Sequence, residues 1–333
     1  MLVLLLISSI LVTFITFKST LTATLFISYP KTLHKHISAK ETTFPLDDIH
    51  CTGLNESSDS ILYLRSISRT GNVMFEYASL FGIAKHHGRR AVMTGKDGNW
   101  MKELFSSLSI PLQQFMHTGL QGVGERQPNT FEPKLYNLPN KKALKVGTWL
   151  GNYKYFIDYE CALRKEFQIH PDMQKKVNEQ LEMLTEEWLK NKKLDKKPAK
   201  MTYIGVHVRR GDKALDGPWT VPEVSYFNKS AAYFRSRYPN TIFVVTSDGM
   251  DWSRKNLKSP DFVFAHNSPH MDMALLGSCN HTLMSVGTFS WWAAWLANGT
   301  TVYFKDHVNP KSILYGMFQD NYYFLPQWIP MTN

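Results

Sequence analysis

A short apolar run that ends in a charged turn limits what this chain can fold into. Met201–Val206 is apolar and rich in β-branched residues, and His207–Asp212, His-Val-Arg-Arg-Gly-Asp, follows it directly. Such a run predicts a buried strand of a parallel sheet, and Gly211 lets the chain turn at its end. Ligands bind at the strand ends of such sheets, so the sequence predicts a binding site here.

The arginines in this turn have two interpretations. Alternation along a strand directs His207 and Arg209 to one side and Arg210 to the other. A guanidinium donates two parallel hydrogen bonds and stays charged, which suits a phosphate or carboxylate ligand. The alternative is a structural ion pair between Arg210 and Asp212, and the hexapeptide alone leaves both open.

Two more predicted strands end in small polar residues. Thr241–Thr246 leads into Ser247-Asp248-Gly249, and Leu283–Val286 leads through a glycine turn to Ser290 and a helix from Trp291. A further helix is expected over Asp272–Asn280. Three polar strand ends, each followed by a helix, predict a doubly wound α/β sheet with a nucleotide-sized crevice.

The first half of the chain predicts a second α/β unit. A strand at Ile61–Leu64, a turn at Gly71-Asn72, a helix up to His87 and a strand at Ala91–Met93 form a βαβ start. The amino end of that helix can meet an anion or a sugar hydroxyl, or Gly71 can serve the tight turn alone. Residues 95–140 allow no prediction.

A long amphipathic helix is predicted between these units. It spans Pro171–Lys193, and we interpret its apolar stripe as packing between lobes. With 333 residues, two domains are the expectation. The predicted organisation is a first α/β lobe at 61–170 on the acceptor side, an interlobe helix and Lys-rich linker at 171–200, and a second α/β lobe at 201–333.

The amino terminus predicts a membrane segment. Met1–Phe17 has no charged side chain, and residues 19–30, after Lys18, have none either. We expect a signal anchor at residues 1–29 and a stem at 30–60, with a cleaved signal peptide as the alternative. No basic residue precedes the apolar run, which the positive-inside rule disfavours for a cytosolic amino end.

Glycosylation sequons indicate a lumenal chain. They begin at Asn55, Asn228, Asn280 and Asn298. Asn280 lies in a dense stretch that we expect to be buried, so glycosylation is predicted only at the other three.

The net charge of +10 suits a nucleic acid, an anionic membrane or an acidic substrate. Much of the excess lies in Lys190–Lys200, which lacks interleaved aromatic residues and is interpreted as a solvated linker, so no nucleic-acid partner is expected. Cys51, Cys161 and Cys279 have no metal-ligand spacing and allow at most one disulfide, whose pairing stays open.

Three segments, in this order, resemble the motifs of the α-1,2-fucosyltransferases. They are His207–Asp212, Val245–Met250 and Cys279–Leu296, with a fourth similarity at Gly71–Ala78 and a fifth at Phe324–Ile329. The resemblance covers about residues 61–330. It implies two Rossmann-like lobes in a GT-B-like fold, GDP-fucose as donor, a galactose-terminated glycan as acceptor, and a single-pass type II Golgi membrane protein with a lumenal catalytic domain. The Ser290-Trp-Trp sequence departs from vertebrate members, which more often have a glycine and another aromatic residue.

The resemblance also implies roles for individual residues. Arg209, with His207 beside it, is the expected catalytic group because more distant fucosyltransferases hold the donor diphosphate with this arginine, and Asp272 is expected near the guanine. The full predicted donor site is Arg209, Arg210, Asp212, Ser247, Asp248, Asp272, Thr288, Phe289, Ser290, Gly71 and Asn72.

The predicted reaction is inverting transfer of L-fucose to the 2-hydroxyl of a terminal β-galactoside. No Asp-x-Asp occurs in the chain, so we expect no cofactor and no divalent metal, with Arg209 stabilising the leaving diphosphate. Four carboxylates remain open as general base: Glu76, Asp212, Asp216 and Glu223. The alternatives are an inactive GDP-sugar-binding or carbohydrate-binding protein and a fucosyltransferase of different linkage.

Overall fold

The computed structural model describes residues 51–66, 68–95, 100–114, 118–127, 129–147, 149–214, 217–318 and 320–333. These residues form an α/β protein with two parallel sheets. The first sheet has the order β3-β2-β1-β5-β4. Its strands are β1 (Ile61–Arg65), β2 (Arg90–Thr94), β3 (Leu112–Gln113), β4 (Gln121–Val123) and β5 (Ala143–Val146).

The second sheet has the order β11-β10-β9-β6-β7-β8. Its strands are β6 (Thr202–Val208), β7 (Thr241–Ser247), β8 (Phe262–Phe264), β9 (His281–Met284), β10 (Thr301–Phe304) and β11 (Ile329–Met331). Chain order runs outward from β6 to β8 on one side and from β9 to β11 on the other, which is the doubly wound Rossmann order. The order reverses between β6 and β9, and this is where such sheets bind ligands. The predicted α/β class with parallel sheets is confirmed.

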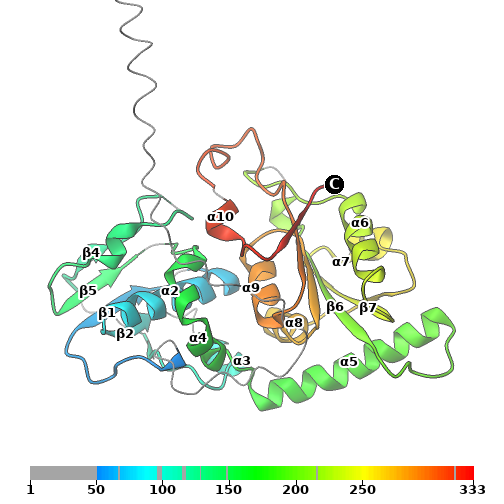
Figure 1. Cartoon of the computed structure of the whole chain (residues 1–333), viewed down its shortest axis with the longest axis horizontal. Coiled ribbons are helices and arrows are strands. Elements are labelled where there is room, and N and C mark those ends of the chain that lie inside the picture. The colour runs from blue at the N-terminus through cyan, green and yellow to red at the C-terminus, as the bar shows by residue number, and fades with distance from the viewer. Residues whose placement is uncertain are drawn as a thin grey trace, which may run out of the picture. The chain divides into compact units, whose positions relative to one another are not determined.

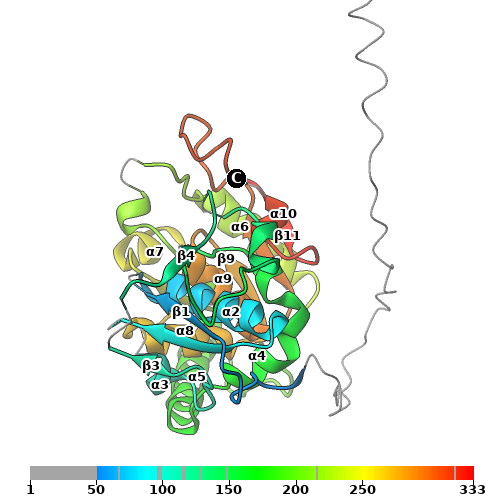
Figure 2. The same cartoon turned by 90° about the vertical axis from the view of Figure 1, so that its left-hand side faces the viewer.

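Helices connect the strands of both sheets (Figure 1). They are α2 (Thr70–His86), α3 (Trp100–Leu104), α4 (Glu160–Glu166), α5 (Pro171–Lys192), α6 (Val224–Arg235), α7 (Met250–Asn256), α8 (Pro269–Gly277), α9 (Thr288–Ala297) and α10 (Asp320–Tyr323). The 3-10 helices are η3 (Pro133–Tyr136), η4 (Tyr153–Tyr155), η5 (Ile157–Tyr159) and η6 (Gly211–Lys213). Helix α2 follows β1 and α9 follows β9, and the two helices pack side by side (Figures 1 and 2).

One aromatic core joins the two sheets. Phe75 of α2 lies 4.6 Å from Trp291 and 5.1 Å from Trp292, ring centroid to ring centroid, and all three side chains are buried. Burying a large apolar side chain stabilises a fold by roughly 1.5–3 kcal/mol, so these contacts hold α2 against α9. Both sheets lie in one compact unit, Leu46–Asn333, and the lobe boundaries at 61–170, 171–200 and 201–333 stay predictions.

Helix α5 packs differently from the prediction. Its buried residues, Val177, Leu184 and Trp188, lie on the predicted stripe, but the helix packs on α8 and on strands β7 and β8. The indole of Trp188 donates a hydrogen bond of 3.1 Å to the carbonyl of Thr241 in β7. The stripe therefore covers the second sheet rather than filling the space between lobes, because its partners belong to that sheet.

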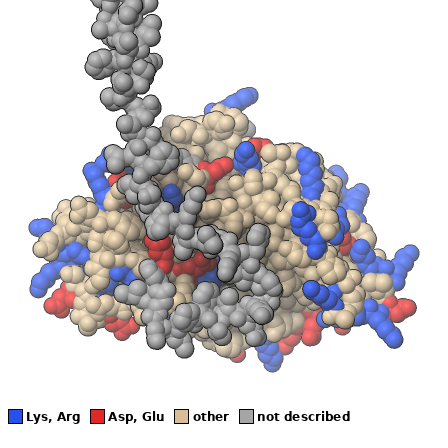
Figure 3. Space-filling model, in the orientation of Figure 1, with Lys and Arg blue, Asp and Glu red and all other residues tan. Residues whose placement is uncertain are grey.

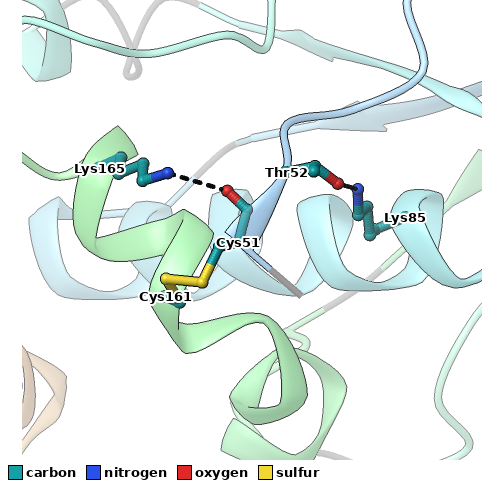
Figure 4. The surroundings of a disulfide bond; sticks show 5 residues. All are labelled: Cys51, Thr52, Lys85, Cys161 and Lys165. Atoms are coloured by element: carbon teal, nitrogen blue, oxygen red, sulfur yellow. Dashed lines mark hydrogen bonds between the residues drawn. A yellow bond between two sulfur atoms is a disulfide. The ribbon is translucent and has the colours of Figure 1, made fainter. Parts of the chain in front are cut away.

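A disulfide links the first described residue to α4. Cys51 pairs with Cys161 across 110 residues, and Lys165 donates a hydrogen bond to the Cys51 carbonyl (Figure 4). Closing a loop of this length stabilises a fold by about 4–5 kcal/mol in the chain-entropy account. Cys279 is a buried thiol.

The predicted signal anchor at 1–29 and most of the stem at 30–60 lie outside the described residues. Within the described part of the chain, no helix is both long and apolar enough to cross a bilayer.

Basic side chains on the face in Figure 3 are interspersed with acidic ones.

The predicted burial of Asn280 is wrong. The residue is exposed because it lies in the short connection between α8 and β9, and its side-chain oxygen accepts a hydrogen bond from the Tyr203 amide. Asn55, Asn228 and Asn298 are exposed too, and their glycosylation stays a prediction.

Candidate active site

Arg209 lies at the carboxyl end of β6, between two carboxylates. Its guanidinium donates to Asp212 through one terminal nitrogen and to Asp248 through the other, while its amide donates to the Ser285 hydroxyl at 2.8 Å. Asp248 follows β7 and Ser285 follows β9, so three neighbouring strand ends position this arginine. Fork-shaped donation to two carboxylates fixes the orientation of the guanidinium.

The alternative interpretation, an ion pair between Arg210 and Asp212, is wrong. Asp212 pairs with Arg209 and, at 3.9 Å, with Arg69. The guanidinium of Arg210 lies over the Trp252 ring at 4.1 Å, and its amide donates to Asp248 at 2.7 Å. The turn at Gly211 brings Asp212 back to Arg209 instead. The two arginines thus have different partners.

Gly211 is required where it stands. Its φ is +27°, a conformation that L residues rarely adopt, and a Cβ there would overlap the Asp248 carboxylate. A larger residue at this position would push Asp248 away from Arg209.

His207 holds the start of α9. Its side chain is 7% exposed, its Nδ1 lies 2.6 Å from the Ser290 hydroxyl, and its ring lies against Phe289. Ser290 also donates to the Val286 carbonyl at 3.2 Å. A hydroxyl has one hydrogen, so both bonds form only when Nδ1 of His207 is the donor.

The His207 imidazole is neutral. Burial, with a smaller effect of Arg209, lowers its pKa to about 3. A buried neutral ring that orients Ser290 has a positioning role in this geometry.

The amino ends of α2 and α9 meet at this site. Thr288 donates to the side-chain oxygen of Asn72 at 2.7 Å, and a Cβ on Gly71 would lie 2.6 Å from the Phe289 amide nitrogen. Gly71 is thus needed for close approach, which neither predicted interpretation included. Neither helix start has a side-chain cap among the described residues, and two helix amino ends carry partial positive charge.

Asp272 and Ser247 lie on α8 and at the end of β7. Asp272 is in the first turn of α8, accepts from Asn267 at 3.0 Å, and burial raises its pKa to about 7. Ser247 donates to the Val208 carbonyl and accepts from the Gly249 amide, so it shapes the turn after β7. Among the described residues, no hydrogen bond or ion pair joins Asp272 to Arg209.

The four candidate bases have different surroundings. Both oxygens of Glu76 accept from serines, Ser66 and Ser68, so this buried carboxylate holds the loop after β1. Asp212 is paired with arginines, Glu223 is exposed, and Asp216 lies outside the described residues.

Sequence reasoning missed several residues of this site. Ser285 and Trp252 hold the arginines, while Arg69 and Lys213 add charge beside Asp212. Of these four residues, only Ser285 could have been found from the sequence, because it lies near the end of a predicted strand. The site thus has four basic side chains and two carboxylates, an excess of two positive charges that suits a diphosphate. The basic side chains are Arg69, Arg209, Arg210 and Lys213, and the carboxylates are Asp212 and Asp248. The described residues contain no cluster of three or more His, Cys, Asp or Glu arranged to hold a metal ion.

Comparison with known proteins gives a family match over nearly all described residues. The model of glycosyl transferase family 11 matches residues 54–332. Galactoside alpha-(1,2)-fucosyltransferase 2 of Mus musculus is 34% identical over 282 residues, which cover 81% of this chain and 78% of that protein. Galactoside alpha-(1,2)-fucosyltransferase 1 of Rattus norvegicus is 32% identical over 271 residues, covering 78% and 70%.

Solved structures of similar fold have lower sequence identity to this chain. The fucosyltransferase NodZ from Bradyrhizobium is 13% identical with a TM-score of 0.45, covering 71% of this chain and 92% of that one. A variant of Arabidopsis thaliana FUT1 in complex with GDP is 14% identical with a TM-score of 0.47, covering 73% and 70%.

Proposed function

The chain belongs to glycosyl transferase family 11, and on this premise we propose that it transfers L-fucose from GDP-fucose to the 2-hydroxyl of a terminal β-galactoside, with inversion. The main support for this activity is the family match over residues 54–332, together with relatives named galactoside alpha-(1,2)-fucosyltransferase. The predicted family and activity are thereby confirmed.

The site supports donor binding at the reversal point of the second sheet. Arg209, Arg210 and the amino end of α9 surround the carboxyl ends of β6 and β9. An anionic diphosphate is stabilised by such a combination of guanidinium groups and helix amino ends. We propose a GT-B-like arrangement in which the second sheet binds GDP-fucose and the first binds the acceptor.

Arg209 has the main catalytic role in this proposal. Negative charge builds on the β-phosphate as the bond to carbon 1 of fucose breaks, so a cation fixed in advance stabilises the transition state more than the ground state. Asp212 and Asp248 hold the guanidinium in place. The lack of Asp-x-Asp in the chain supports a reaction without a divalent metal.

A Golgi membrane location with a lumenal catalytic part is also proposed. The Cys51–Cys161 disulfide and the exposed sequon asparagines support it, since disulfides persist in oxidising compartments. Two measurements on microsomes test this location. The catalytic part should be protected from added protease, and glycosidase treatment should lower the apparent mass of the protein on a gel. Cleavage of the catalytic part in intact microsomes would refute the proposal.

The activity test uses purified full-length protein, GDP-fucose and a panel of β-galactosides. NMR of the product is expected to show a correlation across the glycosidic bond, from H1 of fucose to carbon 2 of galactose. Fucose on carbon 6 of an N-acetylglucosamine, or on a protein hydroxyl, would refute the linkage. A protein that binds GDP-fucose saturably and releases no fucose, even to water, would be the inactive binder instead.

A further inference from the structure

An exposed tryptophan follows β5 at the reversal point of the first sheet. In the order β3-β2-β1-β5-β4, chain order reverses between β1 and β5, so ligands are expected at the carboxyl ends of these two strands. Helix α2 begins shortly after β1, and Trp149 lies three residues beyond β5. Trp149 is 55% exposed to solvent.

The backbone around Trp149 is strained. The φ angles of Trp149 and Leu150 are +71° and +43°, in the left-handed region that favours glycine. Bulky residues rarely adopt this region and persist there only where surrounding contacts enforce it.

Buried contacts on Leu150 enforce this conformation. The Leu150 carbonyl accepts from Ser79 of α2 at 2.8 Å, and its amide donates to Glu125 at 3.0 Å. The Leu150 side chain is fully buried. Leu150 is therefore the anchor of the turn, and the strain projects the indole of Trp149 into solvent. The exposed indole follows the carboxyl end of β5 at the reversal point of the sheet, where ligands of such sheets bind, so it is placed to contact one.

The same segment reaches the second half of the chain. Tyr153 donates to the Asn321 carbonyl at 3.2 Å, and Lys154 lies over the Tyr322 ring at 4.1 Å. In the loop after the neighbouring strand β1, Arg69 pairs with Asp212 beside Arg209. The loops after β1 and β5 thus both contact elements of the donor half.

We propose that Trp149 is the platform on which the terminal β-galactose of the acceptor stacks, an assignment that rests on the proposed function. The axial 4-hydroxyl of galactose leaves the C–H groups of carbons 3, 4 and 5 together on one face. These hydrogens carry partial positive charge, and the face of an indole is negative. Stacking in this way leaves the 2-hydroxyl at the ring edge, free to attack the donor.

Full-length wild-type protein is compared with Trp149→Ala, Trp149→Phe and Met183→Ala. Met183 is a matched control because it is 69% exposed on α5, which packs on the other sheet. Initial rates are measured against methyl β-galactoside and against GDP-fucose, together with GDP-fucose hydrolysis and the melting temperature.

Trp149→Ala is expected to raise KM for the galactoside about tenfold, in the range of aromatic hot spots, and Trp149→Phe less. Donor KM, hydrolysis and melting temperature should stay unchanged, and Met183→Ala should match wild type throughout. Saturation-transfer NMR should place the contact on hydrogens 3, 4 and 5 of the sugar and lose it in Trp149→Ala.

An unchanged galactoside KM in a folded Trp149→Ala protein refutes the platform while leaving the transferase activity standing. A lowered melting temperature with equal losses toward both substrates shows a structural role and refutes it as well. Wild-type protein that hydrolyses GDP-fucose yet fucosylates no galactoside refutes the proposed function itself, and the two failures are thereby distinguished.

Discussion

Asn72 and Thr288 are 216 residues apart in the chain and are joined by a hydrogen bond of 2.7 Å. Asn72 lies in the first turn of α2, which follows β1 of the first sheet, and Thr288 begins α9, which follows β9 of the second. The bond therefore marks the point where the two halves of the site meet. Gly71 allows this approach because its missing Cβ leaves room for the α9 backbone.

Gly71→Ala should separate the two helix starts. The new methyl group would lie 2.6 Å from the backbone of Thr288 and Phe289, which cannot move aside like a side chain. Overpacking of this kind costs about 1–3 kcal/mol. We expect a lower melting temperature and lower kcat, measured by calorimetry and a transfer assay. Gly122→Ala is the control, since nothing lies within 4 Å of its Cβ, and equal behaviour of both variants would contradict the prediction.

Arg209→Lys should abolish most activity with little change in folding. A lysine ammonium lacks the planar fork through which Arg209 donates to Asp212 and Asp248 from two separate nitrogens, and arginines in comparable phosphoryl-transfer roles contribute ~10³–10⁵ in rate. Arg210→Lys loses the stacking on Trp252, so it should act mainly by lowering the melting temperature. Turnover and melting are measured for both. If Arg209→Lys keeps wild-type activity within a few-fold while Arg210→Lys is folded and inactive, the two roles are reversed.

EDTA should leave transfer nearly unchanged. Arginine supplies the cation in the proposed mechanism, so chelating divalent ions removes nothing that the leaving group requires. The assay compares rates in EDTA, in magnesium and in manganese at equal ionic strength. Loss of nearly all turnover in EDTA, restored by manganese, would contradict the proposal.

Glu125→Gln should change how stability depends on pH. Burial raises the pKa of Glu125 to about 8, from an ordinary value of 4.5. Between these values the unfolded chain releases a proton that the folded chain keeps, so wild-type protein loses stability as pH rises. Glutamine still accepts from the Leu150 amide and does not titrate. The melting temperature of Glu125→Gln minus that of wild type should therefore increase from about pH 5 to pH 8.

Glu182→Gln, on the exposed side of α5, controls for the loss of one carboxylate. A difference between Glu125→Gln and wild type that stays flat over this pH range would show that the Glu125 carboxyl keeps an ordinary pKa.

The long strands and helices were predictable because each satisfies its pattern within its own segment. Thr202–Val208 and Thr241–Ser247 are continuous apolar runs, and α5 shows a clear stripe. The partner of α5 was not predictable, since a stripe shows that a face is buried and does not identify what covers it. The short elements β3, β4 and η3 lie within residues 95–140, where no run is long enough to show a period.

The site could be predicted as a set of strand ends, but not as a set of pairs. Sequence order brings Arg209, Asp248 and Ser290 to one sheet edge. The pairing of Asp212 with Arg209 depends on the backbone angles at Gly211, which residue identity alone does not determine. Trp149 gave no signal because its exposure depends on two strained angles and on contacts with distant Ser79 and Glu125.

The shared core of Phe75, Trp291 and Trp292 limits how such an enzyme can diversify. A half taken from a relative would bring an aromatic face shaped for a different partner, and the junction would be left poorly packed. Exchange of whole halves is therefore a poor way to engineer a new acceptor. The exposed side chain of Trp149 lies outside this core, so it can be varied while the junction between the two halves is kept intact.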